Sequence, residues 1–193
     1  MKTIVYMVRH GDSPKTGVSE RTRELSEKGR QDAAQVSQIL LDERVEIFAS
    51  SPYARAVQTI IGAAEVSGQE VFKFEDLKEK RFCAEVHPLA DHDLIPLLER
   101  SFSDSSYSPS GGESNAVCQK RAVRVFKRLL KDYAGKKIAI GSHGAVMTLI
   151  MGHFDPRFNL EFLLQTTKPD IYRMEFQNGL LVSAERIWKP ISI

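Results

Sequence analysis

The sequence predicts an α/β protein: a three-layer α/β/α fold on a mostly parallel, mixed sheet with a C-terminal β-hairpin. Three observations support this fold class. A short apolar strand pattern near the N-terminus is followed by a helical pattern. Strand and helix patterns then alternate, which is typical of a parallel sheet with helices on both faces. Near the end, Asn178-Gly179 separates two strand-like runs, which is the strongest short signal for a hairpin.

The first part of the chain contains two predicted strand–helix pairs. Residues 4–8 form a continuous apolar run, as expected for a strand buried on both faces. Residues 26–41 carry apolar side chains at helical spacing, with Ser26 as the candidate N-cap. Residues 45–49 form the second strand. Pro52 is predicted at the first position of the next helix, where its missing N–H costs nothing.

The remaining elements continue this alternation and end in the hairpin. They are a strand at 71–74, a helix at 117–133, a strand at 137–141, a helix at 145–151 and hairpin strands at 171–176 and 180–188. Residues 101–113 read SFSDSSYSPSGGE, which is too polar and glycine-rich for regular structure. We expect this segment, Ser101 to Glu113, to be a mobile loop or lid.

The composition is that of an ordinary globular domain. A length of 193 residues fits one domain, so we expect a single domain over residues 1–193. With 42% hydrophobic and 27% charged residues the chain is not of the disordered class, and a net charge of +2 argues against a nucleic-acid coat. No apolar stretch approaches the ~20 residues of a membrane helix, and no signal peptide is apparent. We expect a cytoplasmic protein with neither nucleic-acid nor membrane partners.

Two patterns that often mark ligand sites do not do so here. Cys83 and Cys118 lie far apart without CxxC spacing, which predicts plain structural or surface thiols rather than a zinc or redox site. Basic residues recur at helical spacing between residues 120 and 131 but lack interleaved aromatic residues. We therefore predict a solvated helix face rather than a nucleic-acid interface.

Two of the five histidines directly follow predicted parallel strands. His10 comes after the strand at 4–8 and His143 after the strand at 137–141, each beside a glycine that permits a tight turn. In open α/β sheets, ligands bind outside the carboxyl ends of the strands. If these two strands are neighbours, the two imidazoles face each other at that edge.

Further charged residues belong to the same predicted edge. Arg9 precedes His10, and Arg55 lies in the first turn after the second strand. Guanidinium groups match phosphoryl oxygens bidentately, and a histidine can take a phosphoryl group covalently. Glu79 follows the third strand, where it is placed to act as general acid for a leaving oxygen and later as base for water. The pattern predicts phosphoryl chemistry.

A dinuclear metal hydrolase is the alternative use of these residues, with His10, Asp12, Glu79 and His143 as ligands. Two adjacent arginines would repel cations, and the chain lacks HxH, HxxxH or carboxylate-rich spacing. We therefore expect no metal and no other cofactor. Asp12 is expected to orient its loop or to pair with an arginine.

Five motifs occur in order over nearly the whole chain. They are Arg9-His10-Gly11, Ser51-Pro52 followed by Arg55 and Thr59, Leu77-Lys78-Glu79, Gly111-Gly112-Glu113-Ser114 followed by Arg121, and Ser142-His143-Gly144. In this order they resemble the histidine phosphatase superfamily, also called the phosphoglycerate mutase-like family. The resemblance implies a phosphoglycerate mutase-like α/β fold with a mixed sheet, and no metal.

Carried over residue by residue, the resemblance also implies roles for the residues at the sheet edge. His10 is the residue that becomes phosphorylated. Arg9, Arg55 and His143 form the phosphate pocket, and Glu79 is the proton donor. His10, Glu79 and His143 are therefore the expected catalytic residues.

Departures from the family pattern favour a phosphatase. Residues 12–17 lack the asparagine typical of the mutases, Cys83 stands where a glycine is usual, and the longer insertion of the cofactor-dependent mutases is absent. The leading prediction is a metal-independent phosphatase that hydrolyses phosphomonoesters through a phosphohistidine on His10. There are two alternatives. One is phosphoglycerate mutase-type phosphoryl transfer, and the other is a phospho-ligand or phosphoprotein interaction module of the same fold.

The substrate is expected to be a small phosphorylated metabolite, over which the loop at 101–113 would close. Residues of the first loop and of the stretch between Glu79 and Gly112 should select it. The candidate substrate-binding residues are Lys15, Arg21 and Arg81, with Arg23, His87, His92 and Tyr107 as further candidates. His153 and Trp188 are expected to be structural.

Overall fold

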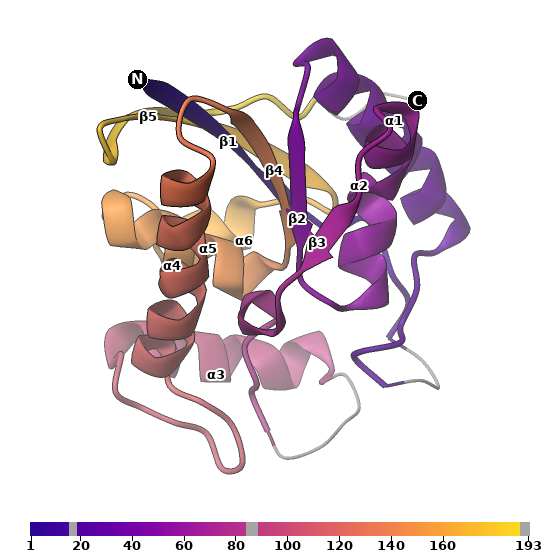
Figure 1. The fold of residues 1–193 in the computed structure, drawn as a ribbon. Coiled ribbons are helices and arrows are strands. Elements are labelled where there is room, and N and C mark those ends of the chain that lie inside the picture. Colours follow the sequence, from indigo (N-terminus) through magenta and orange to yellow (C-terminus); the bar gives the residue numbers. More distant parts are fainter. Residues whose placement is uncertain (16–18, 84–88, 190–193) are drawn as a thin grey trace.

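The computed structural model describes residues 1–15, 19–83 and 89–189, and a six-stranded mixed sheet forms its centre (Figure 1). The strands are β1 (Lys2–Arg9), β2 (Ile47–Ser50), β3 (Val71–Lys73), β4 (Lys137–Ser142), β5 (Asp170–Gln177) and β6 (Leu180–Arg186), in the order β3-β2-β4-β1-β5-β6. The four strands β1 to β4 run parallel, whereas β5 is antiparallel to β1 and to β6. The predicted mixed sheet is confirmed.

Helices cover both faces of this sheet. They are α1 (Glu27–Asp42), α2 (Ala54–Val66), α3 (Asp91–Ser103), α4 (Asn115–Asp132), α5 (Gly144–Phe154) and α6 (Leu160–Gln165), with a 3-10 turn η1 (Glu75–Leu77). Helices α1 and α2 pack on one face, and α4 and α5 pack on the other. Figure 1 shows the two helical layers to the right and to the left of the sheet. The predicted three-layer α/β/α architecture is confirmed.

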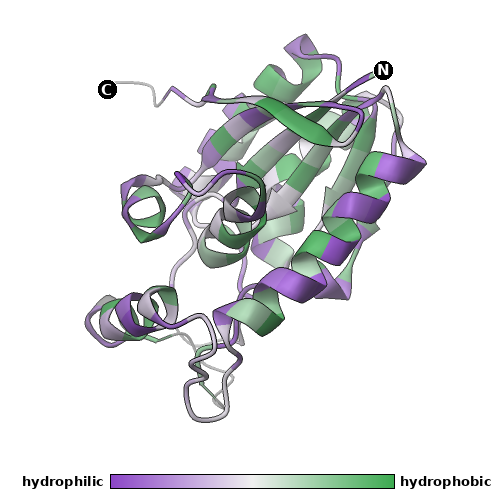
Figure 2. Cartoon of the chain, turned by 90° about the vertical axis from the view of Figure 1, so that its left-hand side faces the viewer, coloured by the Kyte–Doolittle hydropathy of each residue, from purple (hydrophilic) through white to green (hydrophobic). Residues whose placement is uncertain are grey.

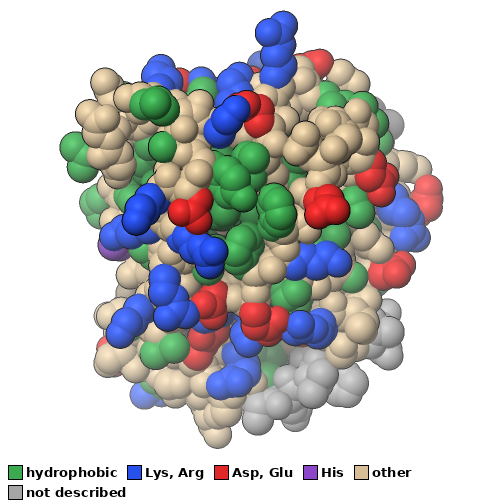
Figure 3. Space-filling view, in the orientation of Figure 1, with side chains coloured by type: hydrophobic (Ala, Val, Ile, Leu, Met, Phe, Trp, Pro, Cys, Tyr) green, Lys and Arg blue, Asp and Glu red, His purple; other side chains and the backbone are tan. Residues whose placement is uncertain are grey.

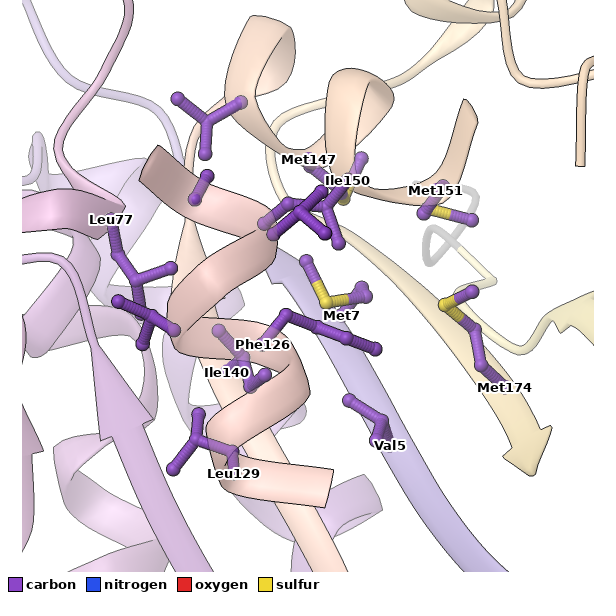
Figure 4. Packing of buried hydrophobic residues seen from close by; sticks show 14 of the residues in the cluster. Val5, Met7, Leu77, Phe126, Leu129, Ile140, Met147, Ile150, Met151 and Met174 are labelled. Atoms are coloured by element: carbon purple, nitrogen blue, oxygen red, sulfur yellow. The ribbon is translucent and has the colours of Figure 1, made fainter. Parts of the chain in front are cut away.

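Strand β1 is buried on both faces, which explains its unbroken apolar sequence. Tyr6, Met7 and Val8 are each 0% exposed. Met7 packs in one cluster with Phe126 of α4 and Met147 of α5 (Figure 4), whereas Tyr6 and Val8 face α1 and α2. Figure 2 shows the apolar sides of the helices turned toward the sheet. Full burial of one such side chain stabilises the folded state by about 1.5–3 kcal/mol. Since any shift of β1 would disturb this packing, its carboxyl end is held in a fixed position.

The cap of α1 and the turn of the hairpin follow the sequence prediction. Ser26 caps α1, since its Oγ accepts from the Gly29 N–H at 3.0 Å. Asn178 and Gly179 connect β5 and β6 with φ values of 52° and 80°, in the left-handed region that this short turn requires. Strand β2 begins at Ile47, two residues later than predicted.

The predicted start of the second helix is wrong. Pro52 is not the first helical residue, because α2 begins at Ala54 and Tyr53 is its N-cap in an extended conformation. The Ser51 N–H still donates to Gly141 O at 2.8 Å, so the chain continues along β4 beyond the end of β2. The helix can begin only after the chain has passed this contact.

The predicted loop at 101–113 is wrong in its first part. Helix α3 extends through Ser103, so only the part from 104 onward is irregular. Pro96 in the interior of α3 obscures the helical pattern, and buried Leu98 holds the helix against α5 and α6. Helix α6 was also not predicted, because six residues give too short a periodic pattern.

The surface carries mixed charge rather than one dominant sign. On the face shown in Figure 3, basic side chains are interspersed with acidic ones. The basic residues of α4 that the sequence places on a solvated face, at positions 120, 124, 127, 128 and 131, are exposed as predicted. Two of these five form ion pairs: Arg124 with Asp76 at 2.6 Å and Arg128 with Asp132 at 3.2 Å. In the part of the chain that the structure describes, no helix combines the length and apolar character needed to cross a membrane.

Candidate active site

The carboxyl ends of β1, β2 and β4 lie side by side and bring the two strand-end histidines together. Strands β1 and β4 pair in parallel with Arg9 opposite Ser142, and the His10 N–H donates to Ser142 O at 3.0 Å. The His10 and His143 rings meet edge to face, with centroids 5.3 Å apart. Their exposed fractions are 6% and 0%. The register of two parallel strands therefore sets the distance between these imidazoles.

His10 is held in one tautomer. Its Nδ1 lies 2.7 Å from Gly11 O, and its Nε2 accepts from Arg55 Nε at 3.1 Å. Because a guanidinium nitrogen can only donate, the proton of the neutral ring belongs on Nδ1, which donates to Gly11 O. Burial, and then the positive charge of Arg55, lower the pKa of His10 well below its ordinary 6.5. The Nε2 lone pair is therefore unprotonated near neutral pH.

Arg55 uses all parts of its guanidinium group. Besides the contact with His10, its Nη1 donates to Glu20 O at 2.5 Å and its Nη2 donates to Glu20 Oε2 at 2.7 Å. Arg23 donates to both carboxylate oxygens of Glu20, at 3.1 and 3.2 Å, and to Ser13 O at 2.8 Å. Arg55 and Arg23 are 1% and 6% exposed. Two buried guanidinium groups thus converge on one carboxylate beside His10.

His143 lies at the N-cap of α5, and its imidazole is fixed from two sides. Its Nε2 is 2.8 Å from Ser51 Oγ, and the Tyr53 ring meets it edge-on with centroids 5.1 Å apart. Ser51 Oγ accepts from Tyr53 N at 3.2 Å and keeps both its proton and a second lone pair for the contact with His143 Nε2. The Nδ1 atom is buried without a hydrogen-bond partner among the described residues. In the tautomer whose Nε2 accepts from Ser51, a proton on Nδ1 is available to a bound anion.

Arg9 is fixed by the segment after α6 and lies close to the start of α5. Its Nη1 donates to Thr166 O at 3.0 Å and also to Thr166 Oγ1. A Cβ at Gly144 would lie 3.0 Å from the Arg9 guanidinium carbon. Glycine therefore permits this close approach. The N-terminus of α5 adds partial positive charge at the same place, which favours an anion.

Glu79 lies shortly after η1, and its half-buried carboxylate reaches the N-terminus of α5. It accepts from the backbone N–H of Lys80 at 2.8 Å and of Val146 at 3.2 Å. Loss of solvent raises the pKa of Glu79 above its ordinary 4.5, although these N–H groups and the charge of Arg55 oppose the shift. Such a carboxyl group keeps its proton to higher pH, as a general acid must.

Arg121 of α4 holds the turn that carries Glu79. It donates to the backbone oxygens of Asp76 at 2.6 Å, Lys78 at 2.9 Å and Glu79 at 3.3 Å. It also pairs with Glu113, which accepts from Arg121 Nη2 at 2.5 Å and from Nε at 3.0 Å. Arg121 therefore positions Glu79 through the main chain rather than through its carboxylate.

A sequence profile of the Histidine phosphatase superfamily (branch 1) matches residues 5–183. The chain belongs to the histidine phosphatase superfamily. This membership confirms the resemblance and the predicted class of enzyme, a phosphomonoester hydrolase of that superfamily. A search of curated proteins finds no match.

Solved structures share the fold at low sequence identity. A phosphoserine phosphatase mutant from Entamoeba histolytica with bound phosphoserine is 24% identical with a TM-score of 0.76, over 94% of this chain and 96% of that chain. Bacillus stearothermophilus YhfR is 20% identical with a TM-score of 0.77, over 93% and 94%. A mycobacterial glucosyl-3-phosphoglycerate phosphatase is 17% identical with a TM-score of 0.75, over 97% and 98%. These solved structures share the predicted fold.

Glu20 and Lys80 are charged residues of this region that sequence reasoning missed. The Lys80 side chain is buried. Its Nζ donates to Asn115 Oδ1 at 2.7 Å and lies 4.9 Å from the centre of the Phe82 ring. Burial lowers the pKa of Lys80 to about 8. Neither residue stands in a local pattern, and the contact of Glu20 with Arg55 spans 35 positions. Only the folded chain shows that Lys80 is buried and that Glu20 contacts Arg55.

The predicted substrate-binding residues contact protein groups outside the cluster of histidine and arginine side chains at the strand ends. Lys15 Nζ donates to Leu89 O at 2.8 Å, and Arg21 pairs with Glu75 at 2.8 Å. Arg81 is exposed. Their role in binding substrate stays a prediction.

The further substrate candidates differ in position. Arg23 lies in the cluster through its contact with Glu20. His92 is exposed, and Tyr107 packs against the Arg100 guanidinium at 4.0 Å from the ring centre. His87 lies outside the described residues.

Three other residues have local structural contacts. Asp12 orients its loop, because its Oδ2 accepts from Ser26 Oγ at 2.6 Å at the start of α1. Trp188 is 5% exposed in the cluster under α1 and α2, whereas His153 is exposed on α5. Among the residues that the structure describes, no three histidine, cysteine or carboxylate side chains group closely enough to hold a metal ion.

Proposed function

We propose that this chain is a metal-independent phosphatase that hydrolyses phosphomonoesters through a phosphohistidine on His10. The observation that carries the proposal is that His10 Nε2 accepts from Arg55 Nε at 3.1 Å inside a buried, cationic pocket, where burial and the charge of Arg55 lower the pKa of His10 and favour a neutral ring. A neutral imidazole nitrogen is a nucleophile, and guanidinium groups match phosphoryl oxygens. Arg9 and Arg55 supply the positive charge that a metal ion supplies in other phosphatases, and His143 would add a neutral N–H donor.

In the first step Arg55 Nε releases His10 Nε2 and donates to a phosphoryl oxygen instead. The freed Nε2 lone pair attacks phosphorus, and the bond from phosphorus to the ester oxygen breaks. Glu79 donates its proton to that oxygen, so the alcohol leaves neutral. The ring of His10 gains positive charge as the new P–N bond forms. Its Nδ1–H donates to Gly11 O at 2.7 Å, and this contact stabilises the charged ring.

In the second step water attacks the phosphohistidine. The Glu79 carboxylate accepts the proton of the water, and the P–N bond breaks with its electron pair returning to Nε2. Inorganic phosphate, neutral His10 and protonated Glu79 result, which restores the starting state. Arg9, Arg55 and His143 serve both steps by holding the phosphoryl oxygens, and loss of one such donor commonly costs about 10²–10³ in rate.

The proposed substrate class is a small phosphorylated metabolite. Support comes from structural neighbours: phosphoserine phosphatase is seen with phosphoserine and with 3-phosphoglyceric acid, and a further neighbour is a glucosyl-3-phosphoglycerate phosphatase. The proposed basis of selection is three basic side chains, those of half-buried Lys15 and of exposed Arg21 and Arg81. The phosphoryl pocket itself would be common to all substrates.

The test compares the wild type with His10→Ala on p-nitrophenyl phosphate in EDTA, between about pH 5 and pH 8. We expect EDTA-resistant release of phosphate by the wild type and a loss of several orders of magnitude in His10→Ala. His153→Ala is the matched control, because His153 is an exposed histidine on α5. Acid-labile, base-stable phosphate on the wild-type protein identifies the intermediate.

Other outcomes would redirect the proposal. An active His10→Ala enzyme contradicts the phosphohistidine mechanism. A phosphohistidine that passes its phosphoryl group to an added sugar acid, but not to water, identifies a mutase. Phosphate binding without turnover of any phosphomonoester identifies an interaction module.

A further inference from the structure

The Glu20 carboxylate occupies the position between the two most buried guanidinium groups of the pocket. Its Oε2 accepts from Arg55 Nη2 at 2.7 Å and from Arg23 Nη2 at 3.1 Å, and its Oε1 accepts from Arg23 Nη2 at 3.2 Å. Arg55 Nε is at the same time 3.1 Å from His10 Nε2. A carboxylate therefore lies on the donors next to the proposed nucleophile.

This carboxylate compensates the charge of the two arginines. Burial lowers the pKa of Arg55, and the negative charge of Glu20 opposes that shift. An uncompensated buried charge is strongly destabilising, so the cluster needs an anion. A carboxylate and a phosphoryl group offer guanidinium groups the same kind of paired oxygens. Either anion can satisfy Arg55 and Arg23, but both cannot occupy one place.

The side chain of Glu20 is free to leave, whereas its backbone is anchored. The side chain is 28% exposed, compared with 1% for that of Arg55, so it has a path to solvent. Arg55 Nη1 donates to the backbone oxygen of Glu20 at 2.5 Å, and this contact does not depend on the carboxylate. Rotation of one side chain would clear the pocket and leave Arg55 in position.

We propose that the Glu20 carboxylate is an internal competitor that the phosphoryl group of the substrate replaces on Arg55 and Arg23. The inference rests on the proposed function, because it requires that this pocket binds phosphate. After hydrolysis the carboxylate returns to the two arginines and displaces inorganic phosphate. Glu20 thereby weakens the binding of product and stabilises the pocket when no phosphate is bound.

The proposal predicts two opposite effects of Glu20→Gln, which removes the charge and keeps the size. The apparent affinity of a site that must first open is reduced by the populated fraction of the open state. If the open state is populated to a few per cent, Glu20→Gln should tighten the binding of inorganic phosphate by roughly tenfold or more. Without phosphate the same substitution should lower Tm, because two buried arginines lose their counter-charge.

The first experiment is calorimetric titration of inorganic phosphate into the wild type, Glu20→Gln and Glu24→Gln in phosphate-free buffer. The second measures the Tm of the same three proteins with and without phosphate. Glu24 is the matched control, since its side chain is 64% exposed and its carboxylate lies 3.8 Å from Arg30. Tighter phosphate binding together with a lower phosphate-free Tm, in Glu20→Gln alone, is the expected result.

The other results overturn the inference. Weaker phosphate binding by Glu20→Gln would show that the carboxylate orients Arg55 for the ligand instead of competing with it. Unchanged binding would show that phosphate does not use this place. Failure of the proposed function is a separate result. If the wild type binds phosphate but hydrolyses no phosphomonoester, the same titration still tests whether phosphate replaces the Glu20 carboxylate on the two arginines.

Discussion

The two halves of the candidate site are built in different ways. His10 and His143 follow parallel strands, Arg55 lies in the first turn of α2, and all three are at most 6% exposed. Their distances follow from strand register and helix geometry. Glu79 lies on a turn between β3 and α3 and is half-buried, and side-chain contacts from Arg121 hold that turn. We call these the strand-end half and the turn half.

The difference matches what each half would meet in a substrate. Residues at strand ends cannot move without disturbing the sheet, so the strand-end half is preorganised for the phosphoryl group that all substrates share. A turn held by side chains can vary without changing the sheet. In the proposed mechanism the turn half faces the leaving group, which differs between substrates. Changes in the strand-end half should therefore affect every substrate alike, and changes in the turn half should depend on the leaving group.

The largest effect that separates the halves is expected for Glu79→Gln. On phosphoserine, whose alkoxide needs a proton to leave, kcat should fall by about 10²–10⁴. On p-nitrophenyl phosphate the phenolate leaves without a proton, so the first step should survive while attack by water is slowed. Rapid mixing should then show a burst of p-nitrophenol and an accumulated phosphohistidine. Equal losses on both esters without a burst would place Glu79 outside acid–base catalysis.

Arg121→Met should produce the next largest effect, because it releases the turn from α4. The Arg121 and Glu113 side chains are 12% and 10% exposed, and breaking such a buried pair costs about 3–5 kcal/mol. We expect that loss in the free energy of unfolding, and a larger fall in kcat on phosphoserine than on p-nitrophenyl phosphate. Arg128→Met is the control on the same helix, with 72% of its side chain exposed. Equal falls on both esters would limit Arg121 to a role in stability.

The strand-end half could be predicted from the sequence because its cause is local. An apolar run followed by Arg9-His10-Gly11 identifies both the strand and the residue at its end, and parallel strands present their carboxyl ends at one edge. The same reasoning places His143. The structure then adds what a pattern cannot contain, namely the 5.3 Å between ring centroids and the tautomer of His10.

The contacts of the turn half and of Glu20 could not be predicted, because they join distant parts of the chain. Arg121 contacts Lys78 across 43 positions, and Glu20 contacts Arg55 across 35. No spacing rule connects such residues before the fold is known. Helix α3 was missed for a different reason, since Pro96 in its interior contradicts the usual position of proline at a helix start.

The pH dependence of stability tests the strand-end half. Burial lowers the pKa of His10 and His143 well below 6.5, whereas in the unfolded chain each titrates near 6.5. Below about pH 6.5 the unfolded chain binds protons that the native site excludes, so stability falls as pH falls. Each histidine contributes up to about 1.4 kcal/mol per pH unit. Denaturant unfolding at several pH values in phosphate-free buffer gives the free energy of unfolding as a function of pH. Below about pH 6.5 this free energy should fall less steeply with falling pH for His10→Gln than for the wild type.

That slope has a direct check. An NMR titration should show no midpoint near 6.5 for the His10 ring, because its native pKa is lower. A normal midpoint, or the same slope in wild type and His10→Gln, would mean that the ring can be protonated in the folded protein. The strand-end half would then not hold the neutral nucleophile that the mechanism requires.

The smallest effect is expected for Arg21→Met. The Arg21 and Glu75 side chains are 56% and 50% exposed, and exposed pairs contribute about 0–1 kcal/mol. We expect little change in stability and unchanged kcat on p-nitrophenyl phosphate. A rise in KM confined to phosphoserine would show that Arg21 leaves Glu75 to bind the carboxylate of the substrate. A fall in kcat on both esters would contradict the division of the site, because an exposed residue away from the strand ends would then act on the phosphoryl group that all substrates share.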